Sequence, residues 1–262
     1  MPDIAINPNT SMKYINIVLS LLSVLFFASC SEAKLLSKNF NKYQIPIEYL
    51  HDSNIITCDK SVKIAIEDNS NIFAFDAPLS VTKTGGKVLP FIFYNYIESI
   101  YNVTLGQYIL EQNYTDFFSN SFLTESQRTG CFSVTDFHEE SDYTIQITHD
   151  TCAVSSEYQQ IDSILFLLFA YSASSQEIGF PTQTTLSINV KLKKEGDSVF
   201  EKNYSINKVQ PFINNNYTNI NNLRSAFVIN MVESLSLGTK ECVEQIIQDI
   251  NNTIGQIITT IN

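Results

Sequence analysis

The sequence predicts an α+β fold, in which an antiparallel sheet is followed by a pair of C-terminal helices. Two patterns carry this prediction. Apolar and polar residues alternate over several short segments between residues 62 and 206, which is typical of half-buried strands. From residue 220 to the end, apolar residues instead recur with the helical period of 3.6. No internal repeat is evident, so we expect one body rather than a repeat array.

The first strands are predicted between residues 62 and 90. Val62, Ile64 and Ile66 would lie on one face of a strand. The segments 79–83 and 87–89 flank Thr84-Gly85-Gly86, which favours a hairpin turn there. The glycines lack the spacing of a phosphate-binding loop, so a turn is the better interpretation.

The middle of the chain predicts a helix and then two strands. The helix covers residues 114–130: Thr115 or Asp116 can cap its start, and Gly130 stops it. A strand is expected over 131–137 and another over 142–148.

A hairpin and two helices complete the chain. Residues 185–192 and 199–206 alternate well, and Glu195-Gly196-Asp197 supplies the turn between them. Two helical stripes then lie on either side of Gly238, and they predict the C-terminal helical pair.

The segment from Ile164 to Tyr171 is the most apolar stretch after the N-terminal region. It is too short to cross a bilayer as a helix. Its length favours a buried core segment. The alternative is a loop or short helix that contacts a membrane or a partner through its apolar side chains, which are Ile164, Leu165, Phe166, Leu167, Leu168 and Phe169.

The N-terminal region has the three parts of a secretory signal peptide. Lys13 precedes an apolar run of 13 residues, Ile15 to Phe27, and the small pair Ala28-Ser29 follows. The run is shorter than the ~20 residues of a membrane-spanning helix. A cleaved leader is therefore favoured over an uncleaved anchor or a buried helix. The small pair followed by Cys30 resembles a bacterial lipobox, in which the cysteine receives lipid and becomes the mature N-terminus.

These features divide the chain into three parts. Residues 1–29 form the signal peptide, and Met12 is the better candidate for its start because residues 1–11 lack positive charge. Residues 30–55 contain the lipidated Cys30 and a polar tether, and residues 56–262 form one α+β domain. Ser31 stands where an inner-membrane retention signal usually carries Asp, so the resemblance implies the outer membrane rather than the inner.

Four cysteines remain after Cys30, and an even number suggests disulfides in an exported protein. Cys131 and Cys152 bracket the predicted strands 131–137 and 142–148, so we expect them to pair. Cys58 and Cys242 would then form the second bridge, although isolated buried thiols are the alternative.

Charge and motifs exclude several functions. The net charge is −11 with no basic cluster, which argues against nucleic-acid binding. No motif of a hydrolase, zinc protease, nucleotide-binding fold or EF-hand occurs. The acidic run around His138, residues 136–142, is interpreted as a solvated turn rather than a metal site. We therefore expect no enzymatic activity, no metal and no cofactor.

The body from Tyr114 to about Ile206 resembles YajG-like and ABC-transport-auxiliary lipoproteins of the bacterial envelope. The resemblance consists of a helix ending at Gly130, a strand, Ser141-Asp142-Tyr143-Thr-Ile-Gln-Ile, a short apolar run ending at Phe180-Pro181, and a hairpin carrying Phe200-Glu-Lys-Asn-Tyr204. It implies helices on one face of an antiparallel sheet, and non-enzymatic work in envelope assembly or lipid transport.

The sequence thus predicts a lipid-anchored envelope lipoprotein that acts as an interaction or assembly module. Its partners would be the membrane, through the lipid on Cys30, and another envelope protein. The alternative is a ligand-binding module, with the aromatic residues of 91–118 lining an apolar pocket. Ordinary core packing also accounts for those aromatics.

Overall fold

The computed structural model describes residues 32–50, 55, 58, 60–67, 77–91, 93–135, 140–167, 170–214 and 219–261. A helix over residues 32–40 comes first. The named elements then follow in this order: β1 (Lys63–Glu67), β2 (Ser80–Phe91), β3 (Tyr94–Thr104), the short 3₁₀ helix η1 (Gln107–Ile109), α2 (Tyr114–Thr129), β4 (Ser133–Thr135), β5 (Tyr143–Leu167), β6 (Ala170–Lys194), β7 (Asp197–Gln210) and α3 (Ile220–Ile261).

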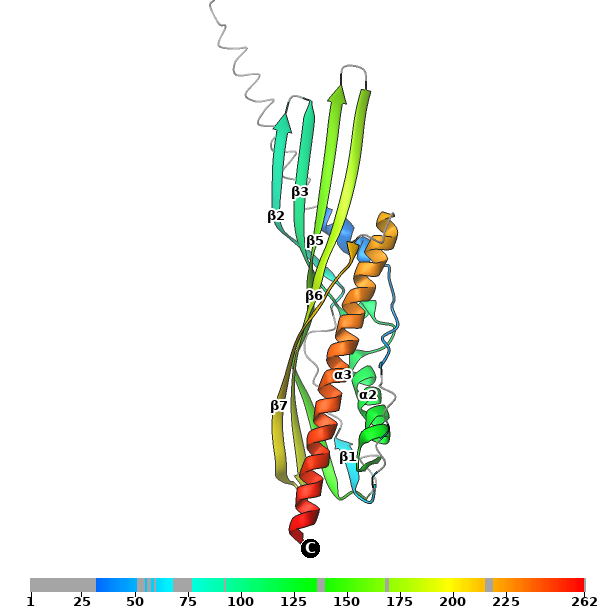
Figure 1. The fold of residues 1–262 in the computed structure, drawn as a ribbon, viewed down its shortest axis with the longest axis vertical. Helices are drawn as coiled ribbons and strands as arrows, with labels where there is room; N and C mark the ends of the chain where they lie inside the picture. Colours follow the sequence, from blue (N-terminus) through cyan, green and yellow to red (C-terminus); the bar gives the residue numbers. More distant parts are fainter. Residues whose placement is uncertain are drawn as a thin grey trace, which may run out of the picture.

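The strands form a single seven-stranded sheet (Figure 1). Its long strands β2, β3, β5, β6 and β7 pair antiparallel in that order. The short strand β1 runs parallel to both β5 and β4, beside the first residues of β5. The predicted α+β class with a mainly antiparallel sheet is confirmed.

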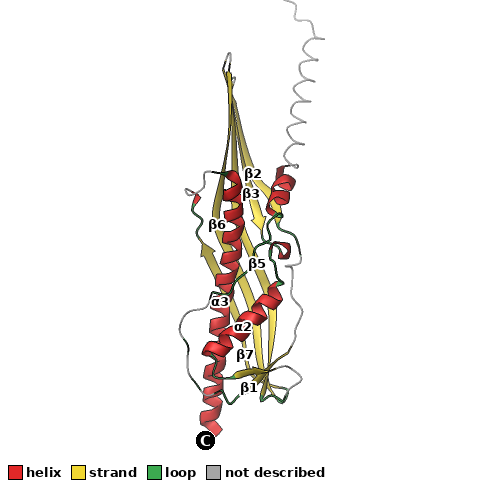
Figure 2. Ribbon diagram, turned by 90° about the vertical axis from the view of Figure 1, so that its right-hand side faces the viewer, coloured by secondary structure: helices red, strands yellow, loops and turns green. Residues whose placement is uncertain are grey.

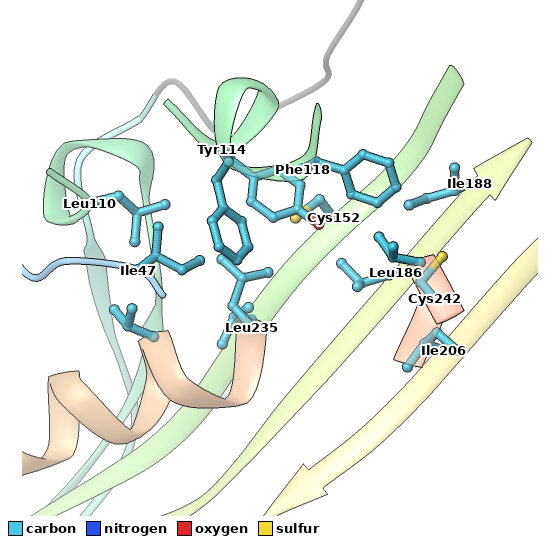
Figure 3. Packing of buried hydrophobic residues seen from close by; sticks show 14 of the residues in the cluster. Ile47, Leu110, Tyr114, Phe118, Cys152, Leu186, Ile188, Ile206, Leu235 and Cys242 are labelled. Carbon is cyan, nitrogen blue, oxygen red and sulfur yellow. The ribbon is translucent and has the colours of Figure 1, made fainter. Parts of the chain in front are cut away.

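The helices cover one face of this sheet (Figure 2). Alternate residues of the central strands are buried, among them Ile145, Ile147 and Val154 of β5 and Leu186 and Ile188 of β6, whereas their neighbours face solvent. This period of two is what a sheet with one covered face requires. Figure 3 shows the resulting core, where Tyr114 and Phe118 of α2 and Leu235 of α3 pack together with strand residues.

The C-terminal helical pair is replaced by one continuous helix, α3, of 42 residues. Gly238 lies inside it instead of ending it. A Cβ at Gly238 would come within 3.2 Å of Thr184 and 3.3 Å of Leu186 on β6. Glycine costs about 1 kcal/mol in a helix interior, but here it permits close packing of α3 on the sheet. The prediction of two helices was wrong because this glycine serves packing and not termination.

The turn predicted at Thr84-Gly85-Gly86 is also wrong. β2 continues through these residues, with an irregularity in its pairing to β3 between Lys83 and Gly85. A β-bulge accommodates glycine as readily as a turn does, so the sequence signal was ambiguous. The second hairpin is confirmed: Lys194 pairs with Asp197, and Glu195 and Gly196 make the turn with positive φ.

Two further boundaries differ from expectation. The N-cap of α2 is Asn113, which accepts a hydrogen bond from the Thr115 amide (3.0 Å), rather than Thr115 or Asp116. The strand expected over 142–148 extends to Leu167.

The segment predicted as a tether belongs to the packed body. Leu36 and Phe40 of the first helix and Ile47 are buried in the core. The tether prediction is therefore wrong for residues 32–50. Its polar composition concealed a helix that presents few but large apolar side chains to the sheet.

The disulfide joins Cys58 to Cys131, with the Cα atoms 5.3 Å apart. Cys152 and Cys242 are buried thiols. Both predicted pairings, Cys131–Cys152 and Cys58–Cys242, are wrong. The topology explains the difference: Cys58 and Cys131 precede the parallel strands β1 and β4, and Val62 accepts a backbone hydrogen bond from Ser133 beside them. Cys152 lies well along β5, beyond the stretch of β5 that pairs with β1.

Reducing the disulfide should destabilise the fold by about 4 kcal/mol, because the bridge closes a sequence separation of 73 residues in the unfolded chain. Urea unfolding with and without dithiothreitol measures this difference. Cys58→Ser should lose the sensitivity to reductant. Peptide mapping that links Cys131 to any other cysteine would contradict the pairing.

Acid should destabilise the fold through His149, which β5 holds against Tyr114 and Phe118 with its Nδ1 unpaired. Burial lowers the pKa of His149 to about 4. The unfolded chain then binds the extra proton first, so stability is full above pH ~6.5 and falls towards pH ~4. We expect a loss of about 2.5 kcal/mol by pH ~4.5. In His149→Leu this part of the pH dependence, measured by urea unfolding, should disappear.

Candidate functional site

The sheet is longer than the helix that covers it (Figure 1). β5 and β6 have 25 residues each, or about 80 Å of extended strand. α3 has 42 residues, or about 63 Å of helix. The ends of β2, β3, β5 and β6 that meet at the two hairpin turns therefore project beyond α3. We call this four-stranded part the arm.

A buried ion pair marks where the arm leaves the body. Arg224, in the first turns of α3, donates from Nε to the Glu177 carboxylate of β6 (2.7 Å). Its Nη2 donates to the other oxygen of the same carboxylate. The Tyr158 hydroxyl of β5 donates to the same carboxylate. The Glu177 side chain is only 1% exposed. Ala170 to Gln176, the residues of β6 before it, are all exposed.

The end of the arm is apolar. Seven large side chains from both hairpins are exposed there, and we call them the apolar tip: Phe91 (68%), Phe93 (57%), Tyr94 (37%), Leu165 (38%), Phe166 (53%), Leu167 (61%) and Tyr171 (76%). A contiguous group of exposed apolar side chains of this kind is typical of a site that contacts a protein or a membrane.

Hydrogen bonds hold the two hairpins together as one surface. β3 pairs with β5 up to Tyr94 and Leu165, and the Phe166 amide donates to the Phe93 carbonyl (2.7 Å). Phe166 also pairs with Tyr171 across the second hairpin. The tip is thus a continuation of the sheet and not two independent loops.

Side chains of the tip point to both faces of the sheet. Phe91, Tyr94 and Leu165 share one row and therefore one face. Ile164 and Phe166 occupy alternate positions of β5, so they lie on the opposite face. Because no described helix covers either face here, the apolar surface surrounds the end of the arm.

The tip also lacks charge. No Asp, Glu, Lys or Arg occurs between residues 88 and 97 or between residues 163 and 176. The first charges met along the strands are Lys87, Glu98, Asp162 and Glu177.

The core interpretation of residues 164–171 is therefore wrong for the part that the structure describes. Leu165, Phe166, Leu167 and Tyr171 are exposed ends of strands, and Ile164 is partly buried. They form neither a core segment nor a short helix. Leu168 and Phe169 lie outside the described residues. The sequence favoured burial because core strands and exposed apolar strand ends have the same composition.

Sequence reasoning missed half of the tip. The sequence offers Phe91, Phe93 and Tyr94 only as candidate pocket or core residues, because it predicts the turn at residues 84–86 and not after Phe91. The uncharged stretch 88–97 was the available signal. It matches the uncharged stretch 163–176, and strand pairing places the two side by side.

The described chain begins at the base of the arm. Glu32 accepts a hydrogen bond from the Tyr101 hydroxyl of β3 (3.2 Å) and lies 3.8 Å from Lys83 of β2. Tyr101 is seven residues from Tyr94, or about 24 Å along β3. Cys30 itself lies outside the described residues and precedes Glu32 by two positions in the sequence.

The aromatic residues of 91–118 do not line a common pocket. Tyr101, Tyr114, Phe117 and Phe118 are buried in the core, whereas Phe91, Phe93 and Tyr94 are exposed at the tip. A cleft of about 280 Å³ lies between residues 45–50 and α3, and one of about 440 Å³ lies beside Phe180 and Pro181. Neither is lined by any of these aromatic side chains.

No cluster of metal-ligating side chains occurs among the described residues. The acidic run around His138 falls largely outside them, since residues 136–139 are not described. Within the described part of the chain, no helix is both long enough and apolar enough to span a bilayer.

Removing the cation of the buried ion pair should loosen the junction between α3 and the arm. Arg224→Met leaves the Glu177 carboxylate buried without its cation, which costs about 3 kcal/mol. The paired variant Arg224→Met with Glu177→Leu should recover most of this loss, measured by urea unfolding. No recovery would show that the carboxylate is needed for Tyr158 rather than for Arg224.

No family model matches the sequence, and no curated protein matches it. Among solved structures, the fold is similar to that of protein XCC0632 from Xanthomonas campestris, assigned to DUF330, with 13% sequence identity and a TM-score of 0.40. The match covers 83% of this chain and 98% of the other.

Proposed function

We propose that this protein is a lipid-anchored lipoprotein of the bacterial envelope, acting as a non-enzymatic interaction module. Its support in the sequence is the leader that ends at Cys30. Its support in the structure is the apolar tip, because an exposed, uncharged surface of this kind is suited to contact rather than to catalysis.

The position of Glu32, the first residue that the structure describes, connects the leader with the tip. Glu32 is held at the base of the arm by Tyr101 and Lys83. A lipid on Cys30 would place the arm, and not the opposite end of the sheet, next to the membrane. Two features thus favour this end of the sheet as the membrane side: the lipobox motif near Glu32 in the sequence, and the apolar tip.

The outer membrane is the proposed location, on the basis of Ser31. The partner of the module is another component of the envelope. One acyl chain holds a protein only marginally, so two or three chains on Cys30, or one chain and a further contact, are needed for firm attachment.

Metabolic labelling with a fatty acid such as palmitate tests the anchor. The wild-type chain should incorporate label and fractionate with membranes, whereas Cys30→Ala should incorporate none and retain its leader. Cys152→Ala is the matched control, because that thiol is buried in the folded body and should not affect labelling. Equal labelling of wild type and Cys30→Ala would refute the lipoprotein assignment.

A further inference from the structure

We infer that the apolar tip inserts into the outer part of a lipid bilayer, so that the arm is a second membrane contact beside the lipid on Cys30. The occupant of this surface is thus phospholipid rather than a protein groove or a second copy of the chain. The inference deepens the proposed function and rests on it for the identity of the membrane.

The distribution of the apolar side chains favours lipid. A protein partner that docks on a sheet covers one face, whereas the tip is apolar on both faces and at its end, with Phe93 in the turn. A bilayer surrounds an inserted object from all sides, so it can bury both faces at once. Phe and Tyr rings are also side chains that suit the boundary between water and acyl chains.

The carboxylates nearest the tip limit how deeply the tip can insert into the bilayer. Leu167 is five residues from Asp162, or about 17 Å along β5, and Tyr94 is four residues from Glu98, or about 14 Å along β3. Deeper insertion would bring these carboxylates into hydrocarbon, which costs several kcal/mol each. Gln160 donates to Asp162 (2.9 Å) and Gln159 donates to Glu98, so both acids lie in polar surroundings.

The open edges of β2 and β6 limit the depth of insertion more strictly. β2 at the tip has only β3 as a neighbour, and the first part of β6 has only β5. Their outer backbone groups would lose hydrogen bonds in the hydrocarbon core. Pro90 removes one such donor on β2, but the others need water or headgroups. Insertion of about 10 Å, to the boundary of headgroups and acyl chains, satisfies both limits.

The anchor and the tip can reach the same membrane. The tip lies about 24 Å from the level of Glu32 along β3, and Cys30 precedes Glu32 by two residues in the sequence. With about 10 Å of the tip inserted, the bilayer boundary would lie about 14 Å from the level of Glu32. Residues 30–31 and the glyceryl group of the lipid would bridge this distance, so that the acyl chains enter the bilayer beside the arm. Because the tip carries no charge, its insertion should not require anionic lipid.

Tryptophan fluorescence tests insertion directly, because the sequence contains no tryptophan. Phe166→Trp places a single reporter at the tip. Val199→Trp, at an exposed position of β7 near the opposite end of the sheet, is the matched control. Both full-length proteins, with Cys30 intact, are reconstituted with phosphatidylcholine vesicles that carry bromine on the acyl chains.

The tip reporter should shift to shorter wavelength and lose most of its emission, more with bromine near the headgroup than with bromine near the chain end. The control should do neither. Adding Leu167→Asp to the tip reporter should abolish the quenching, since a charge at that depth opposes insertion. Because Phe166 and Leu167 are both exposed, the free energy of unfolding measured in urea should not change in this variant.

Three outcomes would overturn the inference: an unquenched tip reporter on vesicle-bound protein, equal quenching at both positions, or quenching only with anionic lipid. A shift of the tip reporter that depends on protein concentration without vesicles would assign the tip to a second copy instead. The two proposals fail separately. Loss of labelling at Cys30 removes the anchor but leaves tip quenching intact, and the reverse result removes the tip and keeps the lipoprotein.

Discussion

The pairing of β5 with β6 is the constraint on which the rest of the structure depends. These two strands stay hydrogen-bonded from Thr144–Lys193 to Leu167–Ala170, through both the body and the arm. In the body, their buried face supports α2 and α3. Beyond Glu177 the same ladder continues without a helix above it. The projecting arm is therefore a direct consequence of strands that are longer than the helix packed on them.

The Glu177–Arg224 ion pair shows how the body ends. An ion pair that is buried on the acid side is costly to form and adds little net stability. It joins the first turns of α3 to β6 at Glu177, directly after the exposed residues 170–176. The ion pair therefore coincides with the end of the helix-covered part of the sheet. The disulfide Cys58–Cys131 holds β1 and β4 at the other end of the body.

The sequence predicted the elements well where one pattern had one physical meaning. The helix from Tyr114 followed from a helical pattern that stops at Gly130, and the hairpin at Glu195-Gly196 followed from strict alternation. It failed where one residue type serves two purposes. Gly238 and Gly85 looked like chain breakers but serve close packing and an irregular strand pairing. The cysteine pairing depended on which strands are parallel, and local patterns do not contain that information.

The sequence predicts only one of the two hairpins of the apolar tip as a contact surface, because the other depends on how the strands pair. The apolar run at Ile164 stands out in the sequence, but its exposure depends on where α3 begins relative to the sheet, which is a property of the packed structure. The residues of the first hairpin, Phe91 to Tyr94, could be joined to it only once the pairing of β3 with β5 was known. In both hairpins the sequence displays the same two properties, a run of large apolar side chains and an absence of charge.

The two proposed attachments at one end of a long molecule would do more together than either alone. A lipid on Cys30 would by itself leave the orientation of the body undefined. An inserted tip would add a second point of contact about 24 Å along the strand direction from Glu32, and two points define an axis. The sheet would then stand away from the bilayer, with the helix-covered body and the β6–β7 turn facing the aqueous space. Each contact also raises the local concentration of the other at the surface, so a marginal tip needs only modest affinity of its own.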